Sequence, residues 1–576
     1  MLSNSLVAAL LAAAYIDVLV LQLNPGLSLS PARLLPLVTK VGLFYAVHLT
    51  VIFYMLLVVR QLFSTEMFSP AWLSVGVLVW LGAAAAAAGA ALIWGNVQTF
   101  TLVLEPATTR EMTSGALALV GASALFVCVA LVRAQFGPRA RAWCALLVAL
   151  IAGGSIAAPL ARRGRGTPPL LEAHPIDTSA APGAAERSAR VAILALDAAS
   201  LEFITSAAAE GRLPNFGRIL DVGAVMHLAT LHPTSAEVVW TAVATGKWPQ
   251  KNGVRSAGDY RLAHGGDPIQ LLPDYCFAHS LVRLGFLVQE PHTSASLRTR
   301  PLWSVLSTLG ISVGVVGWPL TDPAPSVRGY LVSDTYQRAA STRSAIDNAS
   351  AVYPAEIQAD VAAALASAAA ERADVIPAAK VDLRFETPGR TDRASDRIAE
   401  ALERSRLTQV TLVRYQSLDP IGHYFLRYAI PSAFGDVSDE ERRRFGGVLE
   451  RQYAVIDEAI GRAIAALGPE DLLLVVSGYG MEPLGLGKWL LERAIGDPEV
   501  SGTHEAAPDG FLMAYGAPAA KARLLTRASV VDVVPTVLYF LGLPIGRDMD
   551  GYARTDLFQR SFTEERPITF IPTYDR

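Results

Sequence analysis

Apolar residues are distributed very unevenly along this chain. Before residue 161 they form five nearly continuous runs, whereas after residue 190 they form short runs separated by segments of helical periodicity. A helix needs roughly 20 apolar residues to cross a hydrocarbon layer about 30 Å thick. The pattern therefore predicts an all-helical membrane domain at residues 1–163 with about five transmembrane helices. The five runs lie near residues 5–23, 41–59, 72–94, 114–132 and 142–160.

The first run carries a carboxylate, Asp17. A charge in lipid is costly unless it faces the bundle or a polar partner, so Asp17 is either a helix-packing residue or part of a substrate path. The run has no basic start and no small-residue cleavage site. We therefore expect it to be retained as a helix rather than removed as a signal peptide.

Basic residues beside the predicted spans bear on orientation. Three arginines between residues 133 and 141 favour a cytoplasmic loop between the fourth and fifth spans, which places the C-terminal domain outside the cytoplasm. Three more arginines between residues 162 and 165 oppose this assignment. Residues 164–189 are rich in Pro, Ala and Gly, which predicts a flexible linker.

Beyond the linker, the pattern predicts an α/β domain at residues 190–560. Short buried strands alternating with helices indicate a mostly parallel sheet sandwiched by helices. A segment near residues 339–401, rich in Ala and charge, predicts a helical insertion, and residues 561–576 form a C-terminal tail. The clearest strands lie at residues 191–196, 311–316, 409–413 and 472–476.

Composition agrees with a membrane region joined to a second domain. The chain has 576 residues, 52% of them hydrophobic, and a mean hydropathy of +0.35. Its formal net charge of −3 gives no reason to expect a nucleic acid polymer as a partner. Three cysteines are too few for a disulfide framework in the soluble part.

Four residues near predicted strand ends have side chains that bind metals. Asp197 directly follows the first strand, where it is either a cation ligand or an N-cap for the next helix. Asp419 and His423 lie four residues apart and face the same way if their segment makes a turn. With His504 they would supply oxygen and nitrogen ligands of the kind that zinc accepts. Because ligands bind beyond the carboxyl ends of parallel strands, we expect these residues to converge.

Two hydroxyls precede a predicted helix, those of Thr234 and Ser235. A helix N-terminus offers free backbone amides and the positive end of the dipole, which suits a phosphate. Either hydroxyl is a candidate nucleophile, and either one also fits a simple helix cap.

As a set, these segments resemble the type I phosphodiesterase/nucleotide pyrophosphatase branch of the alkaline phosphatase superfamily, over about residues 189–552. The resemblance rests on these runs: Leu-Asp197-Ala, Trp240-Thr-Ala-Val-Ala-Thr-Gly-Lys247, Lys251-Asn-Gly-Val254, Val315-Val-Gly-Trp-Pro319, Val332-Ser-Asp334, Asp419-Pro-Ile-Gly-His423, Gly502-Thr-His504, Pro508-Asp-Gly510, Val531-Asp-Val-Val-Pro535-Thr and Asp548-Met-Asp-Gly551.

The resemblance implies an alkaline-phosphatase-like fold, two divalent metals and a Thr or Ser that attacks phosphorus. The metal is usually zinc, with manganese as the alternative, and this chain would hold one or two ions. By position, Asp419, His423 and His504 match one metal site, and Asp197 with the nucleophile matches the other.

The chain departs from the family pattern at two places. Gly478 and Tyr479 stand where the second metal normally takes an Asp and a His, so they are substituted ligand positions. A gapless match places Ala236 at the nucleophile position, so a local shift to Thr234 or Ser235 is required. Thr234 is slightly favoured, because diesterase members usually use Thr. Replacement ligands would have to come from Glu482, His232, His279 or His292.

The resemblance predicts a membrane-anchored, metal-dependent phosphodiesterase with an incomplete second metal site. One alternative is a phosphoethanolamine- or phosphoglycerol-type transferase acting on a lipid or glycan, and another is a catalytically degenerate binding or assembly protein. The expected partners are a phosphoester or lipid-linked phosphate substrate and the lipid bilayer. We expect an integral cytoplasmic-membrane protein whose soluble domain is extracytoplasmic.

Overall fold

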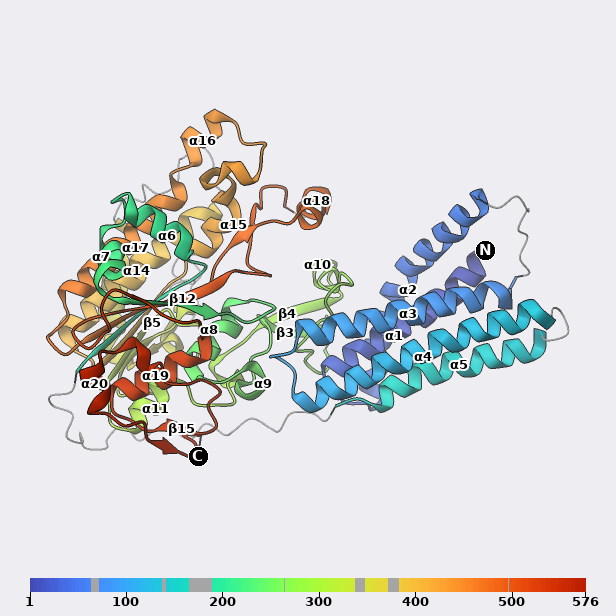
Figure 1. The fold of residues 1–576 in the computed structure, drawn as a ribbon, viewed down its shortest axis with the longest axis horizontal. Helices are drawn as coiled ribbons and strands as arrows, with labels where there is room; N and C mark the ends of the chain where they lie inside the picture. The colour runs from blue at the N-terminus through green and yellow to red at the C-terminus, as the bar shows by residue number, and fades with distance from the viewer. Residues whose placement is uncertain are drawn as a thin grey trace. The chain divides into compact units, whose positions relative to one another are not determined.

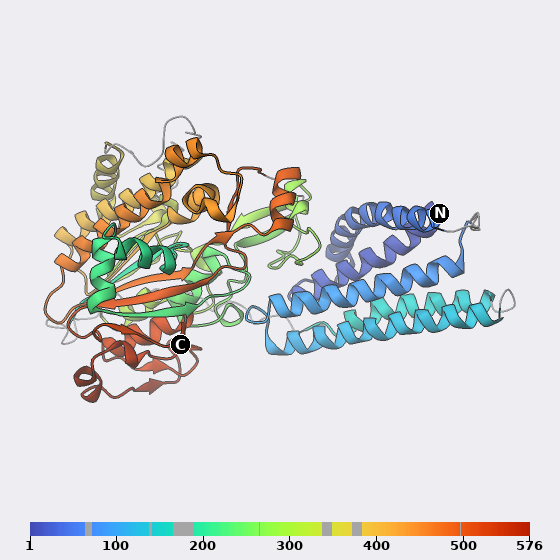
Figure 2. The same cartoon turned by 45° about the horizontal axis from the view of Figure 1, so that its top comes forward.

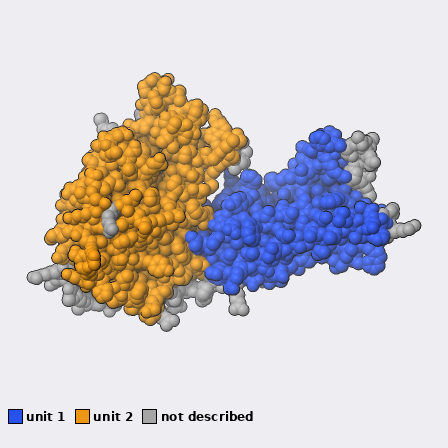
Figure 3. Space-filling model, viewed as in Figure 1, with its two compact units in different colours: residues 1–169, 258–291 blue, residues 170–257, 292–576 orange. Residues whose placement is uncertain are grey.

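The computed structural model describes residues 1–63, 72–136, 141–164, 189–263, 265–336, 348–370, 383–495 and 497–575. The chain divides into two compact units. One unit takes residues 1–169 together with 258–291, and the other takes residues 170–257 and 292–576 (Figure 3). Most of the linker predicted at residues 164–189 lies outside the described residues.

Five helices make up most of the first unit (Figure 1). Four of them contain a predicted membrane run completely, and α3 begins three residues after the start of the third run, at residue 75. All five are long enough and apolar enough to cross a membrane. Their surfaces carry many exposed Leu, Val and Trp side chains, which is the expected composition of a surface that contacts lipid. The prediction of an all-helical region with five long apolar helices is confirmed. The helices are α1 (Leu2–Leu23), α2 (Pro31–Leu62), α3 (Val75–Thr99), α4 (Pro106–Phe136) and α5 (Arg141–Ala161).

Polar side chains tie the end of α1 to the end of α5. The Gln22 amide donates a hydrogen bond of 2.9 Å to the carbonyl of Pro159. The last carbonyls of a helix have no partner within the helix. Arg163, just beyond α5, donates hydrogen bonds to three carbonyls at and beyond the end of α1, those of Leu21, Asn24 and Leu27.

A segment from the second half of the chain belongs to the first unit. Its strands β3 (Gly258–Leu262) and β4 (Leu287–Pro291) pair antiparallel, and α10 (Ser280–Arg283) lies between them in the sequence. Apolar side chains of this segment pack with α1 and α2 in one buried cluster.

Two asparagines bind the backbone of this segment. Asn24 donates to the carbonyl of Leu271 at 2.8 Å and accepts from the amides of Gln270 and Leu271. Asn96, on α3, accepts from the amide of Asp274 at 2.8 Å. No local pattern in the sequence indicates this association, because the partners are 178 to 247 residues apart.

The second unit is built on a 10-stranded mixed sheet. Its central strands are parallel, and β12 runs antiparallel to both of its neighbours. The prediction of a mostly parallel sheet between helices is confirmed. In spatial order the strands are β13 (Arg523–Leu524), β2 (Ala224–Ala229), β12 (Asp509–Tyr515), β9 (Leu472–Tyr479), β1 (Val191–Leu196), β8 (Val410–Tyr415), β5 (Val313–Val316), β6 (Gly329–Val332) and β7 (Val352–Tyr353), with β14 (Ala528–Ser529) also beside β2.

Helices cover both faces of this sheet (Figure 2). Alternate residues of each strand point to opposite faces, so residues 191, 193 and 195 of β1 join one buried cluster and residues 194 and 196 join the other. The first cluster includes α8 (Ala236–Thr245), α11 (Leu302–Thr308) and α19 (Val533–Phe540). In the sequence, α9 (Pro249–Asn252) follows α8 and α20 (Arg560–Glu564) follows α19. The second includes α6 (Leu201–Ala209), α7 (Pro214–Val222), α13 (Gln358–Ala370), α14 (Leu383–Ser405), α15 (Leu418–Ala429), α16 (Asp439–Phe445) and α17 (Val448–Ala465). The remaining elements are α18 (Leu486–Ile495) and two short pairs, β10 (Glu482–Pro483) with β11 (Gly502–Thr503) and β15 (Ile545–Gly546) with β16 (Phe570–Ile571).

Strand register brings the predicted site segments to one edge. β1 lies between β8 and β9 and is parallel to both, and Leu196 pairs with Tyr415 on one side and Ser477 on the other. The residues that follow Leu196 and Tyr415 therefore leave the sheet side by side, next to the last residues of β9. Asp197 directly follows Leu196, and the segment leading to Asp419 follows Tyr415.

Two segments differ in detail from the sequence-based expectation. β9 runs to Tyr479, so Gly478 and Tyr479 are strand residues, because β12 continues the pairing up to Asp509 opposite Tyr479. Helix α14, in the segment expected to be an insertion, packs on the sheet through Ile398 and Leu402. Residues 337–347 and 371–382 of that segment lie outside the described residues.

Replacing Asn24 with Ala should release the 258–291 segment locally. The substitution would leave two amides and one carbonyl of residues 270 and 271 without their partner, and each unpaired buried group costs about 1–3 kcal/mol. Hydrogen exchange of the full-length protein in detergent should then accelerate at residues 265–275. Gln22→Ala is the matched control, because it removes a buried hydrogen bond of α1 that the segment does not share. Equal acceleration at residues 265–275 in both variants would contradict the assigned role of Asn24.

Candidate functional site

Two candidate metal ligands lie on the first turns of α15. Asp419 and His423 are four residues apart on this helix, a spacing that places side chains on the same face. The segment between β8 and α15 is held by Asp392 on α14, whose carboxylate accepts from the amides of Gln416 and Ser417. The start of α15 is therefore anchored to the helical layer behind it.

The third candidate, His504, directly follows β11 and approaches α15 closely. Glycines permit this approach. A Cβ at Gly502 would lie 2.6 Å from the carbonyl oxygen of Gly422, and a Cβ at Gly422 would lie 2.4 Å from the sulfur of Met481. The close packing brings the rings of His423 and His504 to a centroid separation of 5.0 Å.

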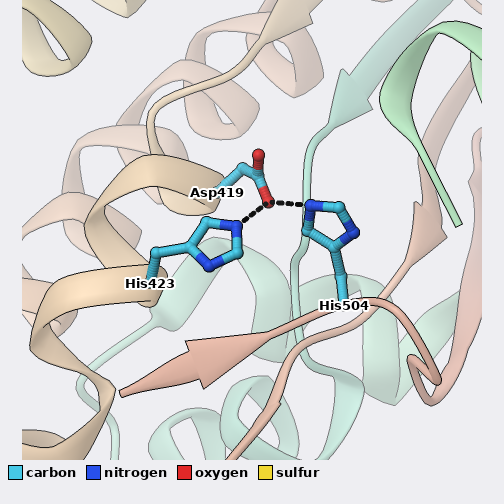
Figure 4. A group of neighbouring side chains, drawn as sticks. All are labelled: Asp419, His423 and His504. Atoms are coloured by element: carbon cyan, nitrogen blue, oxygen red, sulfur yellow. Dashed lines mark ion pairs between the residues drawn. The ribbon is translucent and has the colours of Figure 1, made fainter. Parts of the chain in front are cut away.

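Backbone carbonyls orient both imidazoles. His423 Nδ1 lies 2.8 Å from the carbonyl oxygen of Gly502, and His504 Nδ1 lies 3.2 Å from that of Thr234. A carbonyl can only accept, so each Nδ1 carries a proton, and in a neutral ring this tautomer leaves the lone pair on Nε2. These Nε2 atoms lie 3.7 and 3.5 Å from Oδ1 of Asp419, as Figure 4 shows.

The Asp419 carboxylate completes this cluster. Its Oδ1 is buried and has no hydrogen-bond partner among the described residues, although 21% of the side chain is exposed. Burial raises the pKa of Asp419, and each histidine opposes that shift when it is protonated. The three ligand atoms lie within 4.8 Å of one another. An orphaned oxygen beside two nitrogen lone pairs fits a divalent cation, and three protein ligands leave a coordination position for water or substrate.

Asp197 is not part of that cluster, because its carboxylate has other partners. Arg414 donates from Nε to Oδ1 at 2.9 Å and from Nη2 to Oδ2 at 2.5 Å. Trp240, on α8, donates its indole N–H to Oδ1 at 2.6 Å. Burial disfavours the charge on Arg414, but the Asp197 carboxylate raises the pKa of the guanidinium above its ordinary value. Both side chains are almost fully buried.

The two substituted ligand positions are closely packed. A Cβ at Gly478 would lie 2.4 Å from Cγ1 of Val239. Tyr479 is fully buried, and its ring lies 5.2 Å from the ring of His504. Its phenol oxygen has no hydrogen-bond partner among the described residues. Burial raises the pKa of Tyr479 well above its usual value, as do the carboxylates of Asp197 and Asp419, so the phenol is neutral at pH 7.

The two candidate nucleophiles occupy the entrance to α8. Ser235 is the N-cap residue, and its Oγ accepts from the amide of Val238 at 3.5 Å. Thr234 is buried, and its hydroxyl donates to the carbonyl of Leu231 at 2.7 Å. Because the carbonyl of Thr234 contacts His504, this residue lies directly beside the metal-ligand cluster.

Sequence reasoning did not single out Arg414 or Asp392. The signal for Arg414 was a charged residue inside the otherwise buried strand β8, which requires a buried partner. Asp392 lies on a polar helix among many charged residues, and nothing local marks it. The proposed replacement ligands, including Glu482 and His232, are absent from the one group of three ligand-bearing residues found in the described chain.

Comparisons with known proteins identify the family of the chain. The family model described as type I phosphodiesterase/nucleotide pyrophosphatase matches residues 191–524, more than half of the chain. A solved structure of murine ectonucleotide pyrophosphatase/phosphodiesterase 5 covers 64% of this chain and 100% of its own, with 11% identity and a TM-score of 0.37. The same values hold for an inactive variant of that murine protein in complex with AMP. No curated protein matches the chain in sequence.

Proposed function

Because the chain belongs to the type I phosphodiesterase/nucleotide pyrophosphatase family, we propose that it is a membrane-anchored, metal-dependent phosphodiesterase. Asp419, His423 and His504 would hold the divalent cation, either zinc or manganese. The observation that carries this proposal is the orientation of the two histidines. Backbone carbonyls accept hydrogen bonds from both Nδ1–H groups, so in the neutral rings both Nε2 lone pairs would be available beside the orphaned Oδ1 of Asp419. Such outer hydrogen bonds fix the tautomer that a metal requires.

The bound cation would act as a Lewis acid on a phosphoryl oxygen. The residues of the chain supply the remaining functions. We assign the nucleophile to Thr234, since its backbone lies against His504 and it directly precedes Ser235, the N-cap residue of α8. Its Oγ would lose its proton and form the bond to phosphorus as one ester oxygen leaves and gains a proton, and water would then release the remaining phosphomonoester and return a proton to Oγ. Ser235 would remain the helix cap, with the α8 amides stabilising the phosphoryl charge.

The substrate would be a phosphodiester or a lipid-linked phosphate. A five-helix bundle is larger than an anchor requires, so transfer of a phosphate-containing group to a lipid or glycan is the second candidate. The two functions share the metal site and the nucleophile and differ in the acceptor, which is water in one case and a hydroxyl or amine in the other.

We place the second unit on the extracytoplasmic side of the membrane. The arginines between residues 133 and 141 favour a cytoplasmic loop, and the arginines after α5 had opposed this orientation. Arg163 donates hydrogen bonds to three carbonyls near the end of α1. The position of Arg163 therefore has a structural explanation apart from sidedness, which removes one of the three arginines that opposed an external domain.

The orientation can be tested with a protease site fused after Arg576. Protease added to intact spheroplasts should cut an extracytoplasmic C-terminus, and lysis of the cells should increase the cut fraction little. Cleavage that requires lysis would place the domain inside and contradict the assignment.

Replacing His423 with Ala should abolish both metal binding and turnover. The variant loses one of three protein ligands, so we expect retained metal to fall from near one equivalent to below about 0.1, and hydrolysis of bis-p-nitrophenyl phosphate to fall at least 100-fold. Elemental analysis and turnover would be measured on the same samples. His227→Ala is the matched control, because this exposed histidine lies on β2 outside the cluster.

Three other results would change the conclusion. Unchanged metal in His423→Ala would exclude the assigned ligand set. Metal without turnover in the wild type would favour the transferase. Neither metal nor turnover in the wild type would favour a degenerate binding protein.

The two hydroxyl candidates can be separated by paired substitutions. Thr234→Ala should lose at least about 1,000-fold in turnover while keeping its metal, since the nucleophile is removed and the ligands remain. Ser235→Ala should lose about 1 kcal/mol of stability, because the α8 cap is lost, with turnover reduced less than tenfold. Thermal unfolding and turnover of both variants check this assignment. The reverse ranking of turnover would transfer the nucleophile role to Ser235.

A further inference from the structure

At the carboxyl edge of the sheet, next to the Asp419, His423 and His504 cluster, the guanidinium of Arg414 is a buried positive charge that belongs to the protein itself. We propose that the site takes a single divalent ion and that the guanidinium of Arg414 stands in for a second one. The proposal rests on the proposed function, because it concerns the same site. It differs from the two-metal arrangement that the resemblance implies, and three independent observations support it.

First, both oxygens of Asp197 are engaged. Arg414 takes Oδ1 and Oδ2 through two parallel N–H donors, and Trp240 adds a third hydrogen bond. A bidentate pair of this kind is the strongest contact that a guanidinium makes with a carboxylate. A metal could bind Asp197 only by breaking these contacts inside a buried site.

Second, the other positions expected to ligate that metal cannot do so. Gly478 has no side chain, and the space where a Cβ would stand is filled by Val239, a fully buried residue of α8. Tyr479 has a fully buried phenol, which is not among the side chains that zinc usually takes as ligands. Because Val239 fills this space, a ligand side chain at residue 478 would require the surrounding core to repack.

Third, the charge at this position is permanent. An arginine in a protein remains protonated at any physiological pH, and a second dication beside it would meet a fixed positive charge at short range. The guanidinium neutralises Asp197 and holds it against Trp240 without an exchangeable ion. Arg414 is a positioning residue in this assignment, since it acts through Asp197.

Manganese loading of the unaltered full-length protein tests the proposal without any substitution. Two metals in one catalytic site lie about 3.5–4 Å apart, so a manganese pair gives an exchange-coupled electron paramagnetic resonance spectrum. We expect the six-line spectrum of an isolated Mn²⁺ ion at saturation, and one equivalent of metal by elemental analysis. A coupled spectrum or two equivalents would overturn the single-ion proposal and leave the phosphodiesterase proposal standing.

Variants then identify which carboxylate holds the ion. Asp197→Asn keeps the shape of the side chain and should retain one equivalent of zinc, whereas Asp419→Asn should retain less than about a tenth. Circular dichroism would confirm that both variants fold, and if Asp197→Asn does not fold, the wild-type spectrum decides alone. Loss of zinc from a folded Asp197→Asn would overturn the proposal. A wild type that binds no metal at all would overturn both this proposal and the proposed function.

Discussion

The buried pair of Asp197 and Arg414 is the interaction on which the geometry of this site depends. It joins the ends of two adjacent parallel strands, β1 and β8, and through Trp240 it also fixes the helix that carries the candidate nucleophile at its entrance. Removing one partner of such a pair leaves an uncompensated charge and costs about 3–5 kcal/mol. The pair thus constrains strand ends, helix α8 and the local electrostatic field together.

The metal-ligand cluster depends on a different constraint, close backbone approach. α15 and the strand before His504 meet where residue 502 has no side chain, because a Cβ there would lie 2.6 Å from the carbonyl oxygen of Gly422. The same approach lets the carbonyl of Gly502 accept a hydrogen bond from Nδ1 of His423. The packing of β11 against α15 therefore also orients the His423 ring. The two halves of the edge are consequently different in kind. The cluster of Asp419, His423 and His504 has an orphaned carboxylate oxygen. The carboxylate of Asp197 is instead paired with the guanidinium of Arg414.

The sequence was sufficient to predict the five apolar helices, the layered sheet and the convergence of Asp419, His423 and His504. The helices and the sheet follow from hydrophobic periodicity, and Asp419 and His423 follow a strand that ends at the shared edge. His504 follows β11 of a separate two-stranded sheet, so its place in the cluster came from the family resemblance. The partner of Asp197 could not be predicted in the same way, because Arg414 lies 217 residues away and its pairing depends on strand register. Gly478 shows the same limit. Its identity indicates a lost ligand, but only the packing shows that Val239 has filled the space.

The 258–291 segment shows why the chain must be treated as a whole. It lies between α9 and α11 in the sequence, yet it packs with the helical bundle, so the chain passes between the two units three times. A fragment that began at residue 189 would keep this segment but lose Asn24, Asn96 and the apolar surface of α1 and α2. Leu262, Ile269 and Leu287 would then be exposed to water, at a cost of about 1.5–3 kcal/mol for each fully buried side chain. The apolar helices of the first unit are therefore structural partners of a segment from the second half of the chain, and removing them would expose that segment.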